Sequence, residues 1–156
     1  MVAAKRLLFG HVSIDLLPGP SEVLVLADQS ANPAYAAADI LAQAEHGSGH
    51  ERCWLVSTSA KVIASVEKEI IKQLSERSRQ KYIRKALKKN GWLIQVKSLA
   101  EAVDLANRLA PEHCELMIKN PGLIAKEIVS AGALFLGNNS PTVAGDYVAG
   151  PSHTLP

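Results

Sequence analysis

The chain has 156 residues, of which 47% are hydrophobic, 21% are charged and 4% are aromatic, and its formal net charge is +2. This length is enough to bury a hydrophobic core, and the composition is that of an ordinary globular protein rather than a disordered one. A net charge this small does not indicate nucleic acid or an acidic membrane surface as a partner. We see neither a cleavable leader nor a run of about 18 apolar residues, so we expect no secretion and no membrane span.

The two cysteines, Cys53 and Cys114, are far apart in the sequence, and each lies in or beside an apolar run. They do not form a C-x-x-C pair, so the spacing does not indicate a redox motif. We interpret them as reduced, buried thiols of a cytoplasmic protein.

The first part of the chain leads up to one strongly apolar strand. Residues 1–10 read as the end of a helix, with two basic residues in its last turn and a glycine as its stop. Nothing caps the beginning of that helix, so we expect it to continue from a part of a longer protein. Residues 11–17 are a short extended candidate, and residues 18–21, Pro-Gly-Pro-Ser, predict a sharp turn. Residues 22–27, EVLVLA, are typical of a strand buried on both faces.

The segment from Asn32 to Gly47 is a well-specified helix. Asn32 suits the N-cap, Pro33 suits the first helical position and Gly47 supplies the stop. Gln43 and His46 stand three residues apart, so both would project from one face and could hold one metal ion. Taken alone, such a pair is more often a solvated or hydrogen-bonded helix face than a metal site.

The rest of the chain alternates strand-like and helical patterns. This alternation predicts one α/β domain over residues 1–156, with a mostly parallel sheet and helices on both faces. Ligands of such sheets gather at the carboxyl ends of the strands, although the Pro-Gly-Pro-Ser turn precedes its strand. No glycine-rich dinucleotide or phosphate motif is present. The expected strands are residues 53–57, 92–96, 114–118 and 133–136, and the expected helices are residues 59–74, 77–89, 98–110 and a weak one at 121–130.

The only basic cluster lies in residues 77–89, where seven of thirteen residues are Lys or Arg. It could bind nucleic acid or another anionic ligand, or it could be the solvated face of an amphipathic helix. Because exposed aromatic residues are not interleaved with the basic ones, we favour the solvated face and expect no nucleic-acid partner.

Two further groups of polar residues could carry chemistry. Glu112 and His113 follow a helix that ends at a proline, and one loop could hold them as a base and a proton acceptor. A solvated loop is the commoner explanation of such a pair. Residues 137–156 are rich in Gly, Pro, Asn and Ser without periodicity, and they include Asp146 and His153. Such a tail is either disordered or a functional loop.

Five segments in order link these features: GPSEVLVLAD, LAQAEHG, LAPEHCEL, GALFLG and GDYVAGPSHTLP. They resemble the histidinol dehydrogenase family, and the resemblance runs from the first residues to the last. It implies a cytoplasmic, homodimeric, zinc-dependent enzyme of histidine biosynthesis that oxidises L-histidinol to L-histidine in two NAD-dependent steps through the aldehyde. It also implies an incomplete Rossmann-like, aldehyde-dehydrogenase-like domain.

Carried over by position, the resemblance assigns zinc ligation to Gln43, His46 and Asp146, three of the family's four protein ligands. Nitrogen and oxygen ligands together suit Zn²⁺, although Mn²⁺ could substitute. In the family the metal orients the substrate, so these three residues also count as substrate-binding. Glu112 matches the residue that activates water for attack on the aldehyde, and His113 matches the base that takes the hydroxyl proton and contacts substrate.

Further substrate contacts and several departures follow from the same resemblance. Ser21 in the Gly-Pro-Ser turn and His153 in the tail match substrate contacts, and Tyr147 falls in the same loop. The family's usual Gly-Pro-Asn-His is Gly-Pro-Ser-His here, and Cys114 stands where Leu is usual.

Family members are longer at both ends. Most nicotinamide contacts are expected before Met1, and the fourth zinc ligand, a histidine, is expected beyond Pro156. Two hypotheses follow. Either the residues of this chain hold their catalytic roles, or the chain alone is a folded, inactive domain that binds metal weakly at best. Exposed apolar surface where the rest of the enzyme would pack predicts that the chain dimerises or aggregates.

Overall fold

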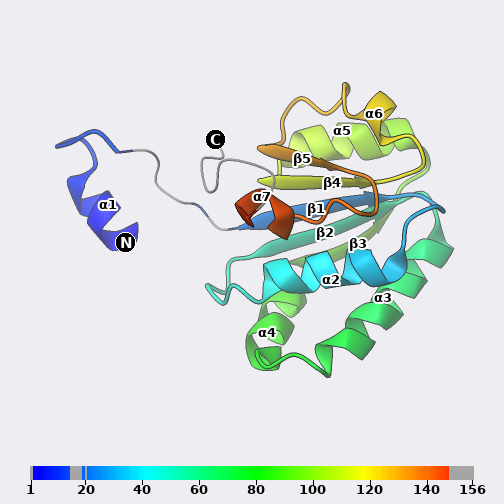
Figure 1. Cartoon of the computed structure of the whole chain (residues 1–156), viewed down its shortest axis with the longest axis horizontal. Helices are drawn as coiled ribbons and strands as arrows, with labels where there is room; N and C mark the ends of the chain where they lie inside the picture. The colour runs from blue at the N-terminus through cyan, green and yellow to red at the C-terminus, as the bar shows by residue number, and fades with distance from the viewer. Residues whose placement is uncertain (1, 15–18, 20, 148–156) are drawn as a thin grey trace.

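The computed structural model describes residues 2–14, 19 and 21–147. Within these residues five parallel strands form one sheet in the order β3-β2-β1-β4-β5, with helices on both faces (Figure 1). This is the first part of the doubly wound order, in which the chain starts at the centre, moves to one edge and then crosses to the other. The predicted α/β class with a mostly parallel sheet is confirmed.

The expected strands are found with their boundaries shifted by no more than one residue. The strands are β1 (Glu22–Ala27), β2 (Arg52–Ser57), β3 (Gly91–Gln95), β4 (His113–Met117) and β5 (Ala133–Leu136). The helices are α1 (Val2–Leu8), α2 (Pro33–Ala44), α3 (Ala60–Leu74), α4 (Gln80–Asn90), α5 (Leu99–Leu109), α6 (Pro121–Ile124) and α7 (Val143–Tyr147).

Strand β1 lies at the centre of the sheet because its side chains are apolar on both faces. Val25 pairs with Leu55 of β2 on one side and with Glu115 of β4 on the other. Residues from Val23 to Ala27 are all buried. A strand with a polar face could not occupy this position without burying unpaired polar groups.

Two hydrophobic cores lie on opposite faces of the sheet. On one face α2, α3 and α4 pack against β1 and β2, and on the other face α5 and α6 pack against β1, β2 and β4. After β5 the chain returns across the first face and forms α7, which lies beside the beginnings of the strands (Figure 1). No helix of the described residues is long and apolar enough to cross a membrane.

Several sequence predictions were wrong in extent, and the helix expected at residues 77–89 begins only at Gln80. The helix expected at residues 121–130 stops at Ile124, because the side chain of Asn107 bonds the carbonyl of Glu127 and the N–H of Val129, each at 2.8 Å. These are backbone groups that a longer helix would use. The tail from residue 137, expected to be irregular, contains α7. Its helical signal is too short to see in sequence, and tertiary contacts hold it in place.

The segment before β1 is described only in part. Helix α1 confirms the predicted helical segment in residues 1–10. The extended segment expected at residues 11–17 is not a strand over its described residues, 11–14. These residues make only an isolated bridge, between Phe9 and Val12. Residues 15–18 and 20, which include most of the expected turn, lie outside the described residues.

Candidate active site

The candidate catalytic residues lie at the amino-terminal edge of the sheet. His113 is the first residue of β4 and pairs with Val23, so it lies in a strand rather than in the expected loop. Glu112 directly precedes it, and Ser21 directly precedes β1. The general expectation that ligands gather at the carboxyl ends therefore does not describe this group, since the turn before β1 and the start of β4 both lie at the opposite edge.

The backbone of Glu22 orients both catalytic candidates. The Glu22 N–H donates to Glu112 Oε2 at 3.0 Å, and His113 Nδ1 lies 3.0 Å from the Glu22 carbonyl oxygen. A carbonyl can only accept, so Nδ1 carries the hydrogen and Nε2 keeps its lone pair. The two side chains are also close, with 3.5 Å between His113 Nδ1 and Glu112 Oε2. The site therefore presents an imidazole nitrogen able to accept a proton beside a carboxylate.

The aromatic ring of Phe135 connects helix α7 with His113. The Phe135 ring lies with its centroid 5.9 Å from that of His113. A Cβ added at Gly145 of α7 would lie 3.2 Å from the Phe135 ring, so glycine allows the close approach of this helix. The backbone of α7, which includes Asp146, is thus brought to the face of the sheet that carries His113.

Gln43 and His46 do not both lie on helix α2, contrary to the prediction from the sequence. Helix α2 ends at Ala44 with Glu45 as its C-cap, so His46 lies in the turn beyond the helix. His46 Nδ1 lies 3.1 Å from the Gln43 carbonyl oxygen, which fixes Nδ1 as the donor. Nε2 of His46 is then the nitrogen available to a ligand, the arrangement in which metal-binding histidines are usually held. Gln43 is buried, and His46 is exposed.

The side chain of Gln43 has an unsatisfied polar end. It is 4% exposed, and its Nε2 atom is buried without a hydrogen-bond partner among the described residues. Buried amides are normally paired, so an unpaired one leaves a donor that a bound water or another group could satisfy. A half-turn of the amide would place the oxygen at the same position, where it could bind a cation. The amide of Gln43 and the imidazole of His46 can each offer one donor atom to a cation.

The structure describes other predicted site residues only in part. For Asp146 and Tyr147 it gives the helical backbone, and their side chains and the whole of His153 lie outside the described residues. Among the described residues no cluster of three or more His, Cys, Asp or Glu could hold a metal ion. Gln43 is not one of these four residue types. For Ser21 the structure describes one hydrogen bond, which its backbone carbonyl accepts from the Arg52 N–H at 3.1 Å.

Three buried acids among the described residues were missed from the sequence: Glu51, which is 1% exposed, and a pair on α2 and β4. Asp39 on α2 is 6% exposed and Glu115 on β4 is 1% exposed. Both lie on the face of the sheet that α2 covers, since Glu115 pairs with Val25 of that core. The sequence did contain a signal for Glu115, because its carboxylate lies in the middle of the apolar run HCELM. A carboxylate at such a position is expected to be buried and to need a partner.

Both cysteines are free and buried, as predicted. Burial, together with the nearby Glu51 carboxylate, raises the pKa of Cys53 to about 12. Burial, together with Glu115, likewise raises the pKa of Cys114 to about 12. At neutral pH both groups are thiols, so neither is a nucleophile or a ready metal ligand.

Comparison with known proteins finds close relatives of the chain. The sequence model of the histidinol dehydrogenase family matches residues 1–156. The histidinol dehydrogenase of Thermus thermophilus is 47% identical over 156 residues, which are 100% of this chain and 37% of that protein. The histidinol dehydrogenase of Rhodopseudomonas palustris is also 47% identical, and the match covers 36% of its length.

A solved structure shows the same fold. The crystal structure of histidinol dehydrogenase from Elizabethkingia anophelis superposes with a TM-score of 0.92 at 40% sequence identity, covering 99% of this chain and 36% of that chain. The chain thus spans little more than a third of the length of the relatives it matches. On the sequence motifs, the family match and the shared fold, the chain belongs to the histidinol dehydrogenase family.

Proposed function

We propose that this chain supplies catalytic and metal-binding residues for the NAD-dependent oxidation of L-histidinol to L-histidine through the aldehyde. The observation that supports this most directly is the pair of contacts to Glu22, which leave His113 Nε2 free to accept a proton beside the Glu112 carboxylate. A dehydrogenase needs a base for the hydroxyl proton, and oxidation of an aldehyde needs a base for water.

Each residue has a distinct role in this proposal. Nε2 of His113 accepts the hydroxyl proton of the alcohol, and the hydrogen bond from Nδ1–H to Glu22 holds the ring and its tautomer. Both described side-chain contacts of Glu112 use Oε2, so Oε1 remains to accept a proton from the water that attacks the aldehyde. NAD, when bound, accepts the hydride.

The metal is also part of the proposal. Gln43, His46 and Asp146 would hold Zn²⁺, in keeping with the unpaired amide of Gln43 and the free Nε2 of His46. A bound zinc ion would supply a fixed positive charge that orients the nitrogen atoms of the substrate. Ser21 and His153 would contact the substrate from the turn before β1 and from the tail.

The catalytic role is tested by His113→Gln in a full-length family member that carries this segment. Reduction of NAD in the presence of L-histidinol should fall by about 10²-fold or more, as expected for loss of a general base, while zinc content should stay unchanged. His11→Gln is the matched control, because His11 is exposed and lies before the sheet. Full turnover by the His113 variant would contradict the proposal.

The 156 residues alone could instead form an inactive domain, because they cover only 37% of the Thermus thermophilus protein and 36% of the Rhodopseudomonas palustris protein. Calorimetric titration with zinc separates the two possibilities. One-to-one binding that His46→Ala abolishes and His50→Ala leaves intact would show that a site forms in this chain. His50 suits the control because it is exposed and only its backbone N–H makes a described bond, to Ser48 Oγ at 3.1 Å. Binding insensitive to His46→Ala would favour the inactive domain.

We also propose self-association, in keeping with the homodimer that the family resemblance implies. Apolar side chains are exposed at both edges of the sheet, Trp92 and Leu93 on β3 and Leu136 on β5. Patches of this kind favour association. Light scattering should show dimers or larger species, and a monodisperse monomer at high concentration would refute the proposal.

A further inference from the structure

A seam runs across the first face of the sheet, between α2 and the segment that returns from β5 to α7 (Figure 1). At one end of this seam the side chain of Asn138 bonds to the backbone on the opposite side. Its Oδ1 accepts from the Asn32 N–H at 2.8 Å, and its Nδ2 donates to the Ser30 carbonyl at 3.1 Å. The seam therefore joins the first turn of the helix that carries Gln43 to the segment that carries Asp146.

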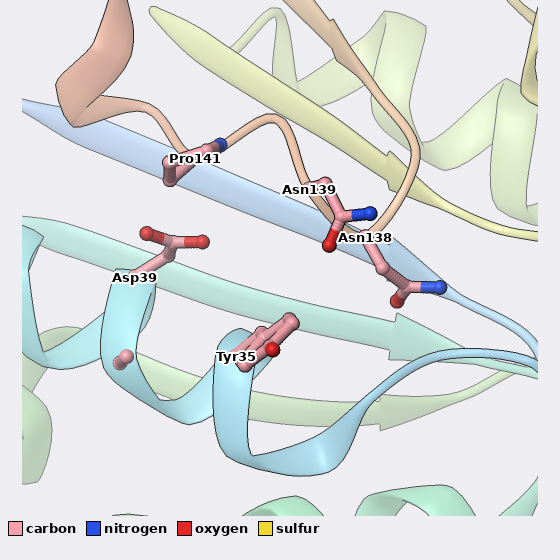
Figure 2. Close-up of a pocket in the computed structure, with 6 residues that line it drawn as sticks. Tyr35, Asp39, Asn138, Asn139 and Pro141 are labelled. Atoms are coloured by element: carbon pink, nitrogen blue, oxygen red, sulfur yellow. The ribbon is translucent and has the colours of Figure 1, made fainter.

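Two buried carboxyl groups occupy the middle of the seam. Oε1 of Glu115 accepts a hydrogen bond from the Thr142 N–H at 3.1 Å, directly before α7. The side chain of Asp39 comes close to this position from α2, near enough for the two carboxyl groups to shift each other's pKa. Figure 2 shows Asp39 pointing from its helix toward the returning segment at Pro141.

The polar groups around this pair are satisfied if the two carboxyl groups hold one proton between them. Oε2 of Glu115 is buried and has no donor among the described residues. Two carboxylates cannot hydrogen-bond to each other, but a carboxylic acid can donate to a carboxylate. A proton on Oε2 of Glu115, donated to Asp39, pairs this oxygen and leaves Oε1 to accept from Thr142.

The position of each group decides where the proton resides. Glu115 is 1% exposed, whereas Asp39 lies at the edge of an open pocket of about 280 Å³ that Tyr35 and Pro141 also line (Figure 2). Burial raises the pKa of Glu115 well above its usual value, and the charge of Asp39 and the hydrogen bond to it raise this pKa further. Burial also raises the pKa of Asp39, while the hydrogen bond to Glu115 opposes that rise. The less buried group keeps the charge.

We propose that Asp39 and Glu115 share one proton, carried by Glu115, and that this pair is a positioning device that fixes the beginning of α7 against α2. The proposal about position rests on the hydrogen bond from Thr142 to Glu115, the burial of both carboxyl groups and the unpaired Oε2 atom of Glu115. Its consequence for zinc rests on the proposed function, because Gln43 follows Asp39 by one helical turn and Asp146 lies in α7.

The substitution Glu115→Gln tests the proton directly. Glutamine has the shape of protonated glutamate, with an N–H₂ group to donate to Asp39 and an oxygen to accept from Thr142. Hydrogen exchange of the Thr142 amide should stay within about twofold of the wild-type rate, whereas Glu115→Ala should speed it by about tenfold or more. Exchange as fast in Glu115→Gln as in Glu115→Ala would overturn the proposal.

Carbon-13 NMR of the side-chain carboxyl groups gives a second measurement that does not depend on a destabilised variant. Glu115 should be protonated at neutral pH, and Asp39→Asn should lower its pKa because the like charge is removed and an amide can donate. Glu101 is the control, since it is an exposed carboxylate that accepts from the Lys97 N–H at 2.7 Å. An ionised Glu115 at neutral pH, or no change in Asp39→Asn, would refute the shared proton.

Zinc titration tests the consequence for the site. Affinity should be kept in Glu115→Gln and fall by about tenfold or more in Glu115→Ala, the size of effect seen when outer-shell partners are removed. If wild-type protein binds no zinc, the metal part of the proposed function fails, while amide exchange and carboxyl titration still decide on the pair. If zinc binds equally to all three proteins, the pair does not position the metal ligands, and the metal site stands.

Discussion

Replacing Gln43 by methionine should stabilise the metal-free protein and weaken zinc binding at the same time. Gln43 is 4% exposed and its Nε2 atom is unpaired among the described residues. An unpaired buried polar group costs about 1–3 kcal/mol, and methionine has a similar length without that group. We expect the free energy of unfolding to rise by about 1–2 kcal/mol in a chelator, and the midpoint temperature by about 2–4 °C per kcal/mol for a chain of this size.

Urea denaturation with a chelator and with zinc measures both effects. Zinc should raise the stability of the wild type by binding the folded state, and it should stabilise Gln43→Met much less. Gln73→Met is the matched control, because Gln73 Nε2 donates to the Ala34 carbonyl at 2.9 Å. That variant should lose about 0.5–1.5 kcal/mol. The reasoning fails if Gln43→Met is less stable than wild type in chelator by as much as the control, since the amide would then be a structural hydrogen-bonding group.

Three further predictions concern the scaffold. A Cβ at Gly132 would lie 2.8 Å from the Glu112 carbonyl oxygen, so Gly132→Ala should lose about 1–3 kcal/mol in denaturation experiments, whereas Gly122→Ala, which meets nothing within 4 Å, should change stability by less than about 0.5 kcal/mol. Burial tends to raise the pKa of Asp28, but hydrogen bonds from Ser30 and from the backbone N–H of Lys119 outweigh this effect and lower the pKa. Its stabilising effect is present above the unfolded-state pKa and is lost as pH falls, so the cost of Asp28→Asn should be largest near neutral pH and shrink in acid; a cost independent of pH would contradict this. Both cysteines, with pKa values of about 12, should react with a thiol reagent only as fast as the protein unfolds, and rapid labelling of folded protein would show that they are accessible.

The buried pair of Asp39 and Glu115 should also make the free energy of unfolding depend on pH. The pKa of Glu115 is raised in the folded protein, so the folded state keeps a proton that the unfolded chain has already released. Stability should therefore fall as pH rises above the unfolded-state pKa, and Glu115→Gln should remove that fall. Denaturation midpoints measured from acid to neutral pH would show it, and an unchanged slope in the variant would assign the dependence to other groups.

Elements with strong local signals could be predicted from the amino-acid sequence alone. The apolar run EVLVLA required burial on both faces and became the central strand β1, and Asn32 with Pro33 set the start of α2, where the Asn32 side chain accepts from the Ala34 N–H at 3.0 Å. Ordered motifs indicated the family. They also pointed to Glu112 and His113, although without showing what holds them.

Only the tertiary structure decided how these residues are oriented. Glu112 and His113 bond to the backbone of Glu22, about ninety positions earlier in the chain, because the register of β1 with β4 places Val23 opposite His113. Periodicity reports which face of an element is buried, but it does not report which element lies opposite. For the same reason the contact of Asp39 with Glu115 was not visible in the sequence. It depends on a returning segment whose own sequence carries no periodic signal, and whose position is fixed by hydrogen bonds to residues distant in the chain.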